Sequence, residues 1–201
     1  MKKIIAAVFI TLAFTFTAFA ENTAGFGINT TTTKLEIEDF DTINQDEFGL
    51  QGFYYHVSET GRFALKTTLD LGAARSDMFD SWESQYLGIL FGLGLAAVKK
   101  NAFNLAIFTT IGIDYVNYNW EETVIGSTID HEANNLDLTL GLDILAKFRF
   151  AKHFGMYADL NVRALAGTFE VSTETHTGTL TSSYDNKGYA VEPSFGLCWT
   201  F

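Results

Sequence analysis

The sequence predicts an all-β fold: an eight-stranded antiparallel up-and-down β-barrel that crosses a membrane, preceded by a cleaved signal peptide. Three observations predict it. The first residues have the pattern of an export signal. From Glu21 onward, apolar and polar residues alternate with the period of two that is typical of strands. Short and long connections then follow each other in strict alternation, as the two ends of an up-and-down meander require.

The export signal covers residues 1–20. Met1-Lys2-Lys3 is a short positive segment, the run that follows is almost purely apolar, and Ala18-Phe19-Ala20 is the small-x-small pattern that signal peptidase reads. The apolar run is shorter than the roughly 20 residues that a membrane-spanning helix needs. We therefore expect cleavage before Glu21 and a single mature domain, residues 21–201, that forms the barrel.

Eight segments of the mature chain have the alternation of strands. In the clearest one, large apolar residues share a single phase: Leu136, Leu138, Leu140, Leu142, Ile144, Phe148 and Phe150. A helix would scatter these residues around its axis. The strong segments cover 62–73, 86–95, 103–115 and 136–150, and weaker ones cover 24–37, 47–57, 154–170 and 187–201. An even number of strands is what a closed antiparallel barrel of this kind needs.

The connections between these segments fall into two classes. The tight turns are 58–61, 99–101 and 151–153, and the longer polar and acidic connections are 38–46, 75–83, 117–134 and 171–186. Short turns that face the periplasm and longer loops that face outward are typical of an outer-membrane barrel. Folding about the tight turns sets Gly49 against Asp70 and Asp143 against Asn161, so polar faces meet polar faces.

The two faces of the strands can be assigned in two ways. A secreted, lipocalin-like binder would have an apolar interior and a polar exterior. The apolar faces here are broad and nearly free of charge, whereas the polar faces are rich in Gly, Ala, Ser and Thr, which suit a narrow eight-stranded interior. Aromatic residues also gather near the strand ends, as two interfacial girdles require. We therefore predict that the apolar face contacts lipid and the polar face lines the lumen.

The last strand carries a second signal. Its apolar residues alternate up to a terminal aromatic residue: Tyr189, Phe195, Leu197, Trp199 and Phe201. This resembles the C-terminal signal by which outer-membrane barrels are recognised for assembly. In size, strand number and loop asymmetry the mature chain is similar to the small outer-membrane barrels of the OmpX, OmpW and OmpA-domain type. The resemblance implies a bacterial outer-membrane location, with outer-membrane lipid and the barrel-assembly machinery as partners.

The predicted lumen carries charges of both signs. We expect a lumen charge network of Arg62, Lys66, Asp70, Asp114, Asp137, Asp143, Lys147, Arg149, Asp159, Arg163 and Glu192. Near-balance of sign favours a salt-bridged plug, because an unpaired ion in a narrow lumen is costly. The alternative is a polar relay for ions or small solutes.

Composition and motifs exclude several classes of function. A net charge of −11 excludes nucleic acid as a partner, since phosphate binding needs a basic surface. The single cysteine, Cys198, excludes an internal disulfide framework. No arrangement of serine, histidine and acids predicts catalysis, and no spacing predicts a metal site. We therefore expect no enzymatic activity and no cofactor.

Two functions remain open. The first is a closed barrel that presents acidic extracellular loops in a structural, adhesion or envelope-interaction role, with a surface ligand as partner. Its Ser/Thr-rich segment 172–183 could extend a hairpin above the membrane. The second, implied by the resemblance to OmpW, is a conduit for small hydrophobic molecules. It needs an apolar patch in the outer half of the lumen, and these large apolar residues point inward: Phe53, Tyr55, Tyr86, Leu90, Phe108, Leu145, Leu165 and Phe169.

Overall fold

The computed structural model describes residues 21–38, 42–58, 62–77, 84–100, 102–124, 127–175 and 178–201. The predicted signal peptide, residues 1–20, lies outside these ranges, so the cleavage site and the domain boundary at Glu21 remain predictions. Some of the predicted loop positions, among them 39–41 and 78–83, also lie outside them. Within the described ranges, no helix has the length and apolar character needed to cross a membrane.

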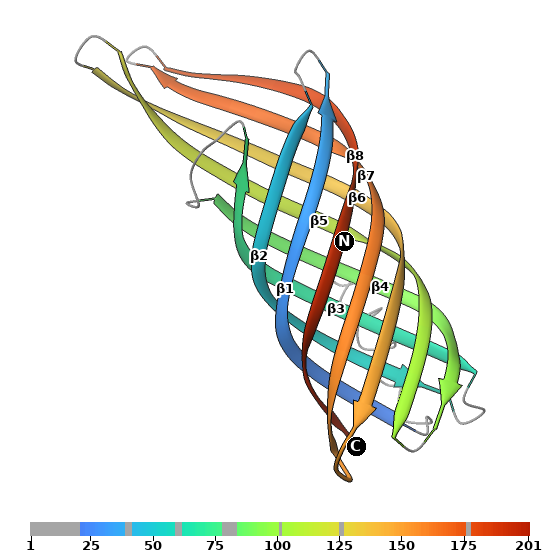
Figure 1. The fold of residues 1–201 in the computed structure, drawn as a ribbon. Coiled ribbons are helices and arrows are strands. Elements are labelled where there is room, and N and C mark those ends of the chain that lie inside the picture. Colours follow the sequence, from blue (N-terminus) through green and yellow to red (C-terminus); the bar gives the residue numbers. More distant parts are fainter. Residues whose placement is uncertain are drawn as a thin grey trace, which may run out of the picture.

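The chain folds into eight consecutive strands. They are β1 (Glu21–Ile37), β2 (Ile43–Val57), β3 (Phe63–Ser76), β4 (Ser84–Lys99), β5 (Phe103–Val124), β6 (Ser127–Arg149), β7 (Phe154–Thr175) and β8 (Gly178–Thr200). Each strand pairs antiparallel with the next, and β8 pairs with β1 to close the barrel (Figure 1). The predicted fold class is confirmed.

The barrel has two different ends. We call the end with the connections after β2, β4 and β6 the short-turn end, and the opposite end the loop end. The chain termini meet at the short-turn end, where Asn22 and Phe201 exchange two backbone hydrogen bonds of 3.1 and 2.9 Å. The three predicted tight turns all lie at this end, whereas two of the four predicted longer connections, between β5 and β6 and between β7 and β8, have only two residues each.

The second half of the barrel is longer than the first. Strands β1–β4 have 14 to 17 residues, whereas β5–β8 have 22 or 23. The pairing of β4 with β5 ends at Asn117, and that of β1 with β8 ends at Asn186, but the β5–β6 and β7–β8 hairpins continue beyond both points. Figure 1 shows these hairpins extending past the ends of β1–β4.

We call residues 118–124, 127–133, 169–175 and 178–185 the protruding sheet. The predictions that 117–134 and 171–186 are loops are wrong, because both segments are paired hairpins to within two residues of their tips. The reason is β-propensity: aromatic and β-branched residues such as Tyr118, Trp120 and Val171 continue the alternation into segments that their acidic residues mark as loops. The predicted hairpin extension at 172–183 is confirmed.

One register prediction is correct and one is shifted. Asp143 pairs with Asn161, as predicted. Gly49 pairs with Gly72 rather than with Asp70. The shift arises because the connection after β2 is wider than a tight turn: the Ser58 N–H bonds the Phe63 carbonyl at 2.8 Å. A shift of two residues keeps every side chain on its own face, so the predicted assignment of side chains to the two faces is unchanged.

The apolar face of the strands is outside. On β6, Leu138 and Leu140 are each 60% exposed, whereas the neighbouring Asp137 and Thr139 are 2% and 1% exposed. The same separation holds around the wall, with large apolar side chains outward and polar ones inward. A closed barrel of this polarity is suited to lipid, and the lipocalin-like alternative, which needs an apolar interior, does not fit.

Candidate functional site

The lumen is divided into three layers. Buried polar side chains form a central group between two groups of buried apolar ones, although further buried polar residues, such as Asn104, Lys147 and Ser76, lie near the two ends. The inner cluster, at the short-turn end, is Phe53, Tyr55, Val57, Ala64, Ala106, Phe108, Leu145, Tyr157 and Cys198. The outer cluster, at the loop end, is Leu35, Ile37, Ile43, Ala74, Tyr86, Val116, Tyr118, Ala133, Leu165, Phe169 and Ala190.

Between them lies the polar belt, which contains two ion-pair centres. The first is built on Lys66 of β3. Its Nζ lies 2.7 Å from Asp143 Oδ2 of β6 and also forms an ion pair with Asp159 of β7. All three side chains are buried, and the amine lies 5.6 Å from the centre of the Phe53 ring. The pairs tie β3 to strands on the other side of the lumen.

The second ion-pair centre is built on Arg163 of β7. Its Nε donates to Asp114 Oδ2 at 2.8 Å, and its Nη1 donates to Glu192 Oε2 at 2.6 Å. Its Nη2 donates to the Tyr86 hydroxyl at 3.2 Å, and the Gln51 amide donates to the other Glu192 oxygen at 2.9 Å. One guanidinium therefore links β4, β5, β7 and β8, and Glu192 extends the link to β2.

Three buried acids have no ion pair with any described residue. Asp70 accepts a hydrogen bond from Asn29 Nδ2 at 3.1 Å, and Asp137 accepts one from Asn135 Nδ2 at 2.7 Å. Glu47 accepts hydrogen bonds from the Gln45 amide and from Thr33 Oγ1. Amide and hydroxyl donors satisfy these acids in part, but they do not supply the opposite charge that a buried carboxylate requires.

Glu47 is a lumen residue that the sequence analysis missed. It begins the predicted strand 47–57 next to the acidic connection 38–46 and is absent from the predicted charge network, but it is buried inside the barrel. A signal was present, because residue 47 falls in the same alternating phase as Gln45 and Gln51, which also point inward. Phase should therefore have been preferred to the nearby acidic composition.

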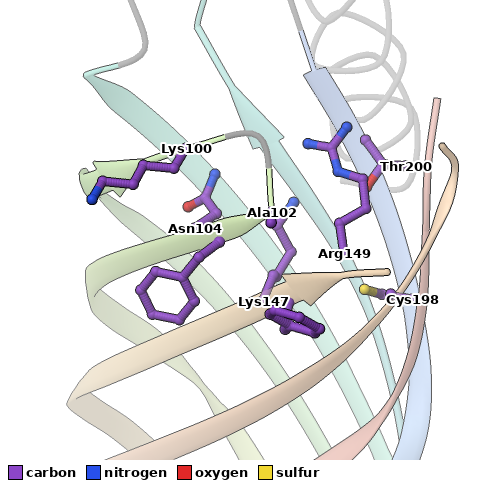
Figure 2. Close-up of a pocket in the computed structure, with 10 residues that line it drawn as sticks. Lys100, Ala102, Asn104, Lys147, Arg149, Cys198 and Thr200 are labelled. Atoms are coloured by element: carbon purple, nitrogen blue, oxygen red, sulfur yellow. The ribbon is translucent and has the colours of Figure 1, made fainter. Parts of the chain in front are cut away.

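Two cations, Lys147 and Arg149, lie near the short-turn end of the lumen. Lys147 Nζ donates to Glu21 Oε1 at 3.1 Å and to Thr23 Oγ1 at 2.7 Å, and it lies 4.4 Å from the centre of the Tyr55 ring. Arg149 lies 3.6 Å from the same carboxylate. Figure 2 shows the pocket around them. Its volume is about 10 Å³, at the lower limit for a single water molecule.

Arg62, which the sequence analysis placed in the lumen network, lies elsewhere. It precedes β3, its side chain is exposed, and its carbonyl accepts a hydrogen bond from the Ala96 N–H at 3.0 Å. The strand alternation does not reach Arg62, because Arg62 lies in the turn, where the backbone no longer keeps the strand phase.

The predicted near-balance of charge is not observed among the described residues. The buried acids are Glu47, Asp70, Asp114, Asp137, Asp143, Asp159 and Glu192, and the buried bases are Lys66, Lys147 and Arg163. Arg62 lies outside the lumen and Arg149 is only half-buried at its edge. The lumen therefore has an excess of acidic groups in its middle and outer parts.

The residues of the predicted assembly signal lie on the lipid-facing side of β8. Four of them are exposed there: Tyr189, Phe195, Leu197 and Trp199. The Trp199 ring packs edge to face against the Phe154 ring, with 4.2 Å between the ring centres. Recognition of these residues by the assembly machinery stays a prediction. Among the described residues, no group of three histidine, cysteine or acidic side chains is placed to hold a metal ion.

Comparison with known proteins identifies the architecture. A major outer membrane protein from Thermus thermophilus matches with a TM-score of 0.58 and 11% identity, over 89% of this chain and 99% of that one. OprG from Pseudomonas aeruginosa matches with a TM-score of 0.53 and 8% identity, over 92% of this chain and 97% of OprG. AlkL, solved in lipid bilayers, matches with a TM-score of 0.51 and 11% identity, over 91% and 90%.

At these identities the matches describe the fold, and sequence comparison adds no closer relative. No protein-family profile matches the chain, and no curated protein matches it. The fold of these three outer-membrane proteins, the apolar outer wall and the polar interior agree with one another. The chain has the fold of these outer-membrane proteins, a closed eight-stranded antiparallel β-barrel.

Proposed function

We propose that this protein is a closed, non-conducting barrel whose function lies in the protruding sheet, which acts as a surface for contact with an extended partner strand. The proposal places the barrel in the outer membrane with its short-turn end facing the periplasm and its loop end facing outward. The observation that carries the proposal is the edge of β8 beyond Asn186, where β8 pairs with β7 but no longer with β1.

The β8 edge has the chemistry of a strand acceptor. Residues Leu180 to Ser183 carry no charge and no proline, and Leu180 is 69% exposed. Proteins usually protect edge strands with charged residues or proline, so an uncharged edge is open to pairing with another strand. The β5 segment of the same sheet differs in sequence, because residues 121 and 122 are both glutamates.

The packed lumen supports a barrel without conductance. The two ion-pair centres cross the interior, and an apolar cluster lies on each side of them. An eight-stranded barrel is also only wide enough for its own side chains. We expect no ion conductance from the protein in planar bilayers, and steady single-channel currents would contradict the closed barrel.

The edge can be tested with a strand probe. We expect an uncharged fluorescent peptide with the sequence of residues 178–184 to bind the barrel in micelles, measured by anisotropy. Replacing Leu180 and Ser182 with lysine should abolish this binding, because lysine on an edge disfavours strand addition. The control replaces the exposed Asn119 of β5 with lysine and should leave binding intact. Equal binding by both variants would refute the proposal.

One observation favours a second function, a conduit for small hydrophobic molecules. The outer cluster supplies the apolar patch in the outer half of the lumen that such a conduit needs, and Trp120, Val171 and Tyr184 pack against it. Its side chains are buried against one another, so a molecule could enter only by displacing them. Uptake of a small apolar dye into liposomes that contain the barrel, without ion flux, would favour this function over a closed barrel.

We also propose that residues 1–20 direct export and that the outward residues of β8, ending at Phe201, are read by the barrel-assembly machinery. The alternation of large apolar residues up to Trp199 and Phe201 supports the second point. Truncating the chain before Trp199 should reduce the amount of barrel in the outer membrane while leaving export unchanged. Normal assembly of the truncated chain would contradict an assembly signal at this end.

A further inference from the structure

An apolar recess lies in the wall of the barrel near the short-turn end. Its volume is about 510 Å³, within the range of about 300–1,000 Å³ for small-molecule sites. Its outward lining comes from three strands: Leu93 and Leu95 of β4, Ile107 and Thr109 of β5, and Leu142 of β6. Arg62 is the charged residue of the lining. The recess has no part in the strand-binding function proposed above.

Two residues with small side chains, Thr109 and Ala97, line this recess. Leu93, Thr109 and Leu142 lie in one cross-strand row, so a threonine stands between two leucines on the lipid-facing side. Near the end of β4, the pairing with β5 shifts by one residue between Ala96 and Val98. This β-bulge leaves Ala97 without a cross-strand partner, and a bulge locally bends the strand that carries it.

Arg62 is held at the edge of this recess by the backbone. The Ala96 N–H donates to its carbonyl at 3.0 Å, one residue before the bulge. The side chain is exposed and forms no ion pair with any described residue. Lys99 and Lys100 follow the bulge along the chain and are also exposed. A positive group therefore lies where the apolar lining ends.

The position of this positive group matches the depth of a lipid headgroup. Phe63 and Phe103, which follow the neighbouring short turns, are exposed on the wall at the same end of the barrel. Exposed aromatic residues at strand ends mark the boundary between hydrocarbon and headgroups. Arg62 precedes Phe63 in the chain, so its guanidinium can reach the phosphate region while the recess lies in hydrocarbon.

We propose that the recess is a binding site for one anionic phospholipid of the leaflet at the short-turn end. An acyl chain lies along Leu93, Thr109 and Leu142, and the lipid phosphate pairs with Arg62. Lys99 and Lys100 add positive potential near the headgroup. Apolar contact alone would hold any lipid, whereas the exposed arginine selects one with net negative charge.

The test is native mass spectrometry of the full-length protein, purified from the outer membrane in detergent and titrated with phosphatidylglycerol. We expect one tightly bound lipid per barrel. Arg62→Gln should weaken its affinity about fivefold, the effect of about 1 kcal/mol for one cation near a headgroup. Thr109→Leu fills the recess and should weaken the lipid affinity by about tenfold, because the acyl chain loses buried contact.

Matched controls separate the site from general lipid contact. Lys152→Gln removes an exposed cation at another short turn, and Ala158→Leu adds bulk to the lipid-facing side of β7, away from the recess. Both should bind like the wild type. The four variants should also migrate as folded barrels in unheated gels, so that a loss of lipid is not a loss of fold.

Several outcomes would overturn the proposal. If Arg62→Gln and Lys152→Gln weakened the lipid affinity equally, the positive charges would attract the lipid without forming a specific site. If Thr109→Leu had no effect on the affinity, the recess would not be occupied by the lipid. Equal affinity for phosphatidylcholine with the same acyl chains would remove the charge selection. Displacement by inorganic phosphate would indicate a free-phosphate site. A lipid-free dimer that Thr109→Leu dissociates would show that a second copy covers the recess.

Discussion

The two faces of β6 show how differently the membrane and the lumen constrain a side chain. Leu138 and Leu140 face lipid, while Asp137 and Asp143 on the alternate positions face the lumen. The outward positions need only be apolar, because lipid offers no specific partner. The inward positions carry charge, and their stability depends on what stands across the lumen, as the difference between paired Asp143 and unpaired Asp137 shows.

The largest effect is expected where a lumen cation is removed. Lys66→Met leaves Asp143 and Asp159 buried without their shared partner, so the free energy of unfolding should fall by about 3–5 kcal/mol. Urea unfolding from lipid vesicles measures this change. Adding Asp143→Asn and Asp159→Asn to the same chain should restore much of the loss. An unchanged stability of the single variant would mean that the pairs do not hold the lumen together.

A charge on the lipid face should cost slightly less. Leu140→Arg places a guanidinium near the middle of the lipid-facing side of β6, which should lower the free energy of unfolding by about 2–4 kcal/mol in the same measurement. The neighbouring inward change Thr139→Ser serves as its control and should be nearly silent, within about 0.5 kcal/mol. A large loss for Thr139→Ser with none for Leu140→Arg would reverse the assignment of the faces.

Both predictions rest on faces that the sequence alone could predict, because strand alternation has a period of two. Lys66, Asp143, Asp159 and Arg163 all lie in the lumen phase of their segments, and all are buried inside. Their pairing could not be predicted in the same way. Lys66 and Asp143 come from strands that are not neighbours, so their contact depends on strand tilt and stagger around the whole barrel.

Errors in the sequence analysis occurred where the alternation meets a connection. Arg62 shares the phase of β3 but lies in the turn, and Glu47 lies in the lumen although it is next to an acidic connection. The segments of the protruding sheet are acidic and polar, which predicts loops, yet they form paired strands. Polar residues are equally compatible with a loop and with a strand that stands in water, since neither face of such a strand needs to be apolar.

The smallest change in the free energy of unfolding is expected for a buried acid that has no ion pair with a described residue. Glu47 accepts hydrogen bonds only from neutral groups among the described residues, so Glu47→Gln keeps an acceptor and removes a buried charge. We expect stability to stay the same or rise by up to about 1 kcal/mol. Glu192→Gln is the contrasting change, since it removes the charge that faces Arg163 at 2.6 Å and should cost about 3 kcal/mol or more.

Urea unfolding of both variants gives the answer directly. If Glu47→Gln were as destabilising as Glu192→Gln, Glu47 would have to act as a charged member of the network, and the division of lumen acids into paired and unpaired ones would fail. If neither variant lost stability, the ion pair between Glu192 and Arg163 would contribute nothing net, because its desolvation would cancel its attraction. A loss at Glu192 alone would show that a lumen carboxylate stabilises this barrel only through the cation opposite it.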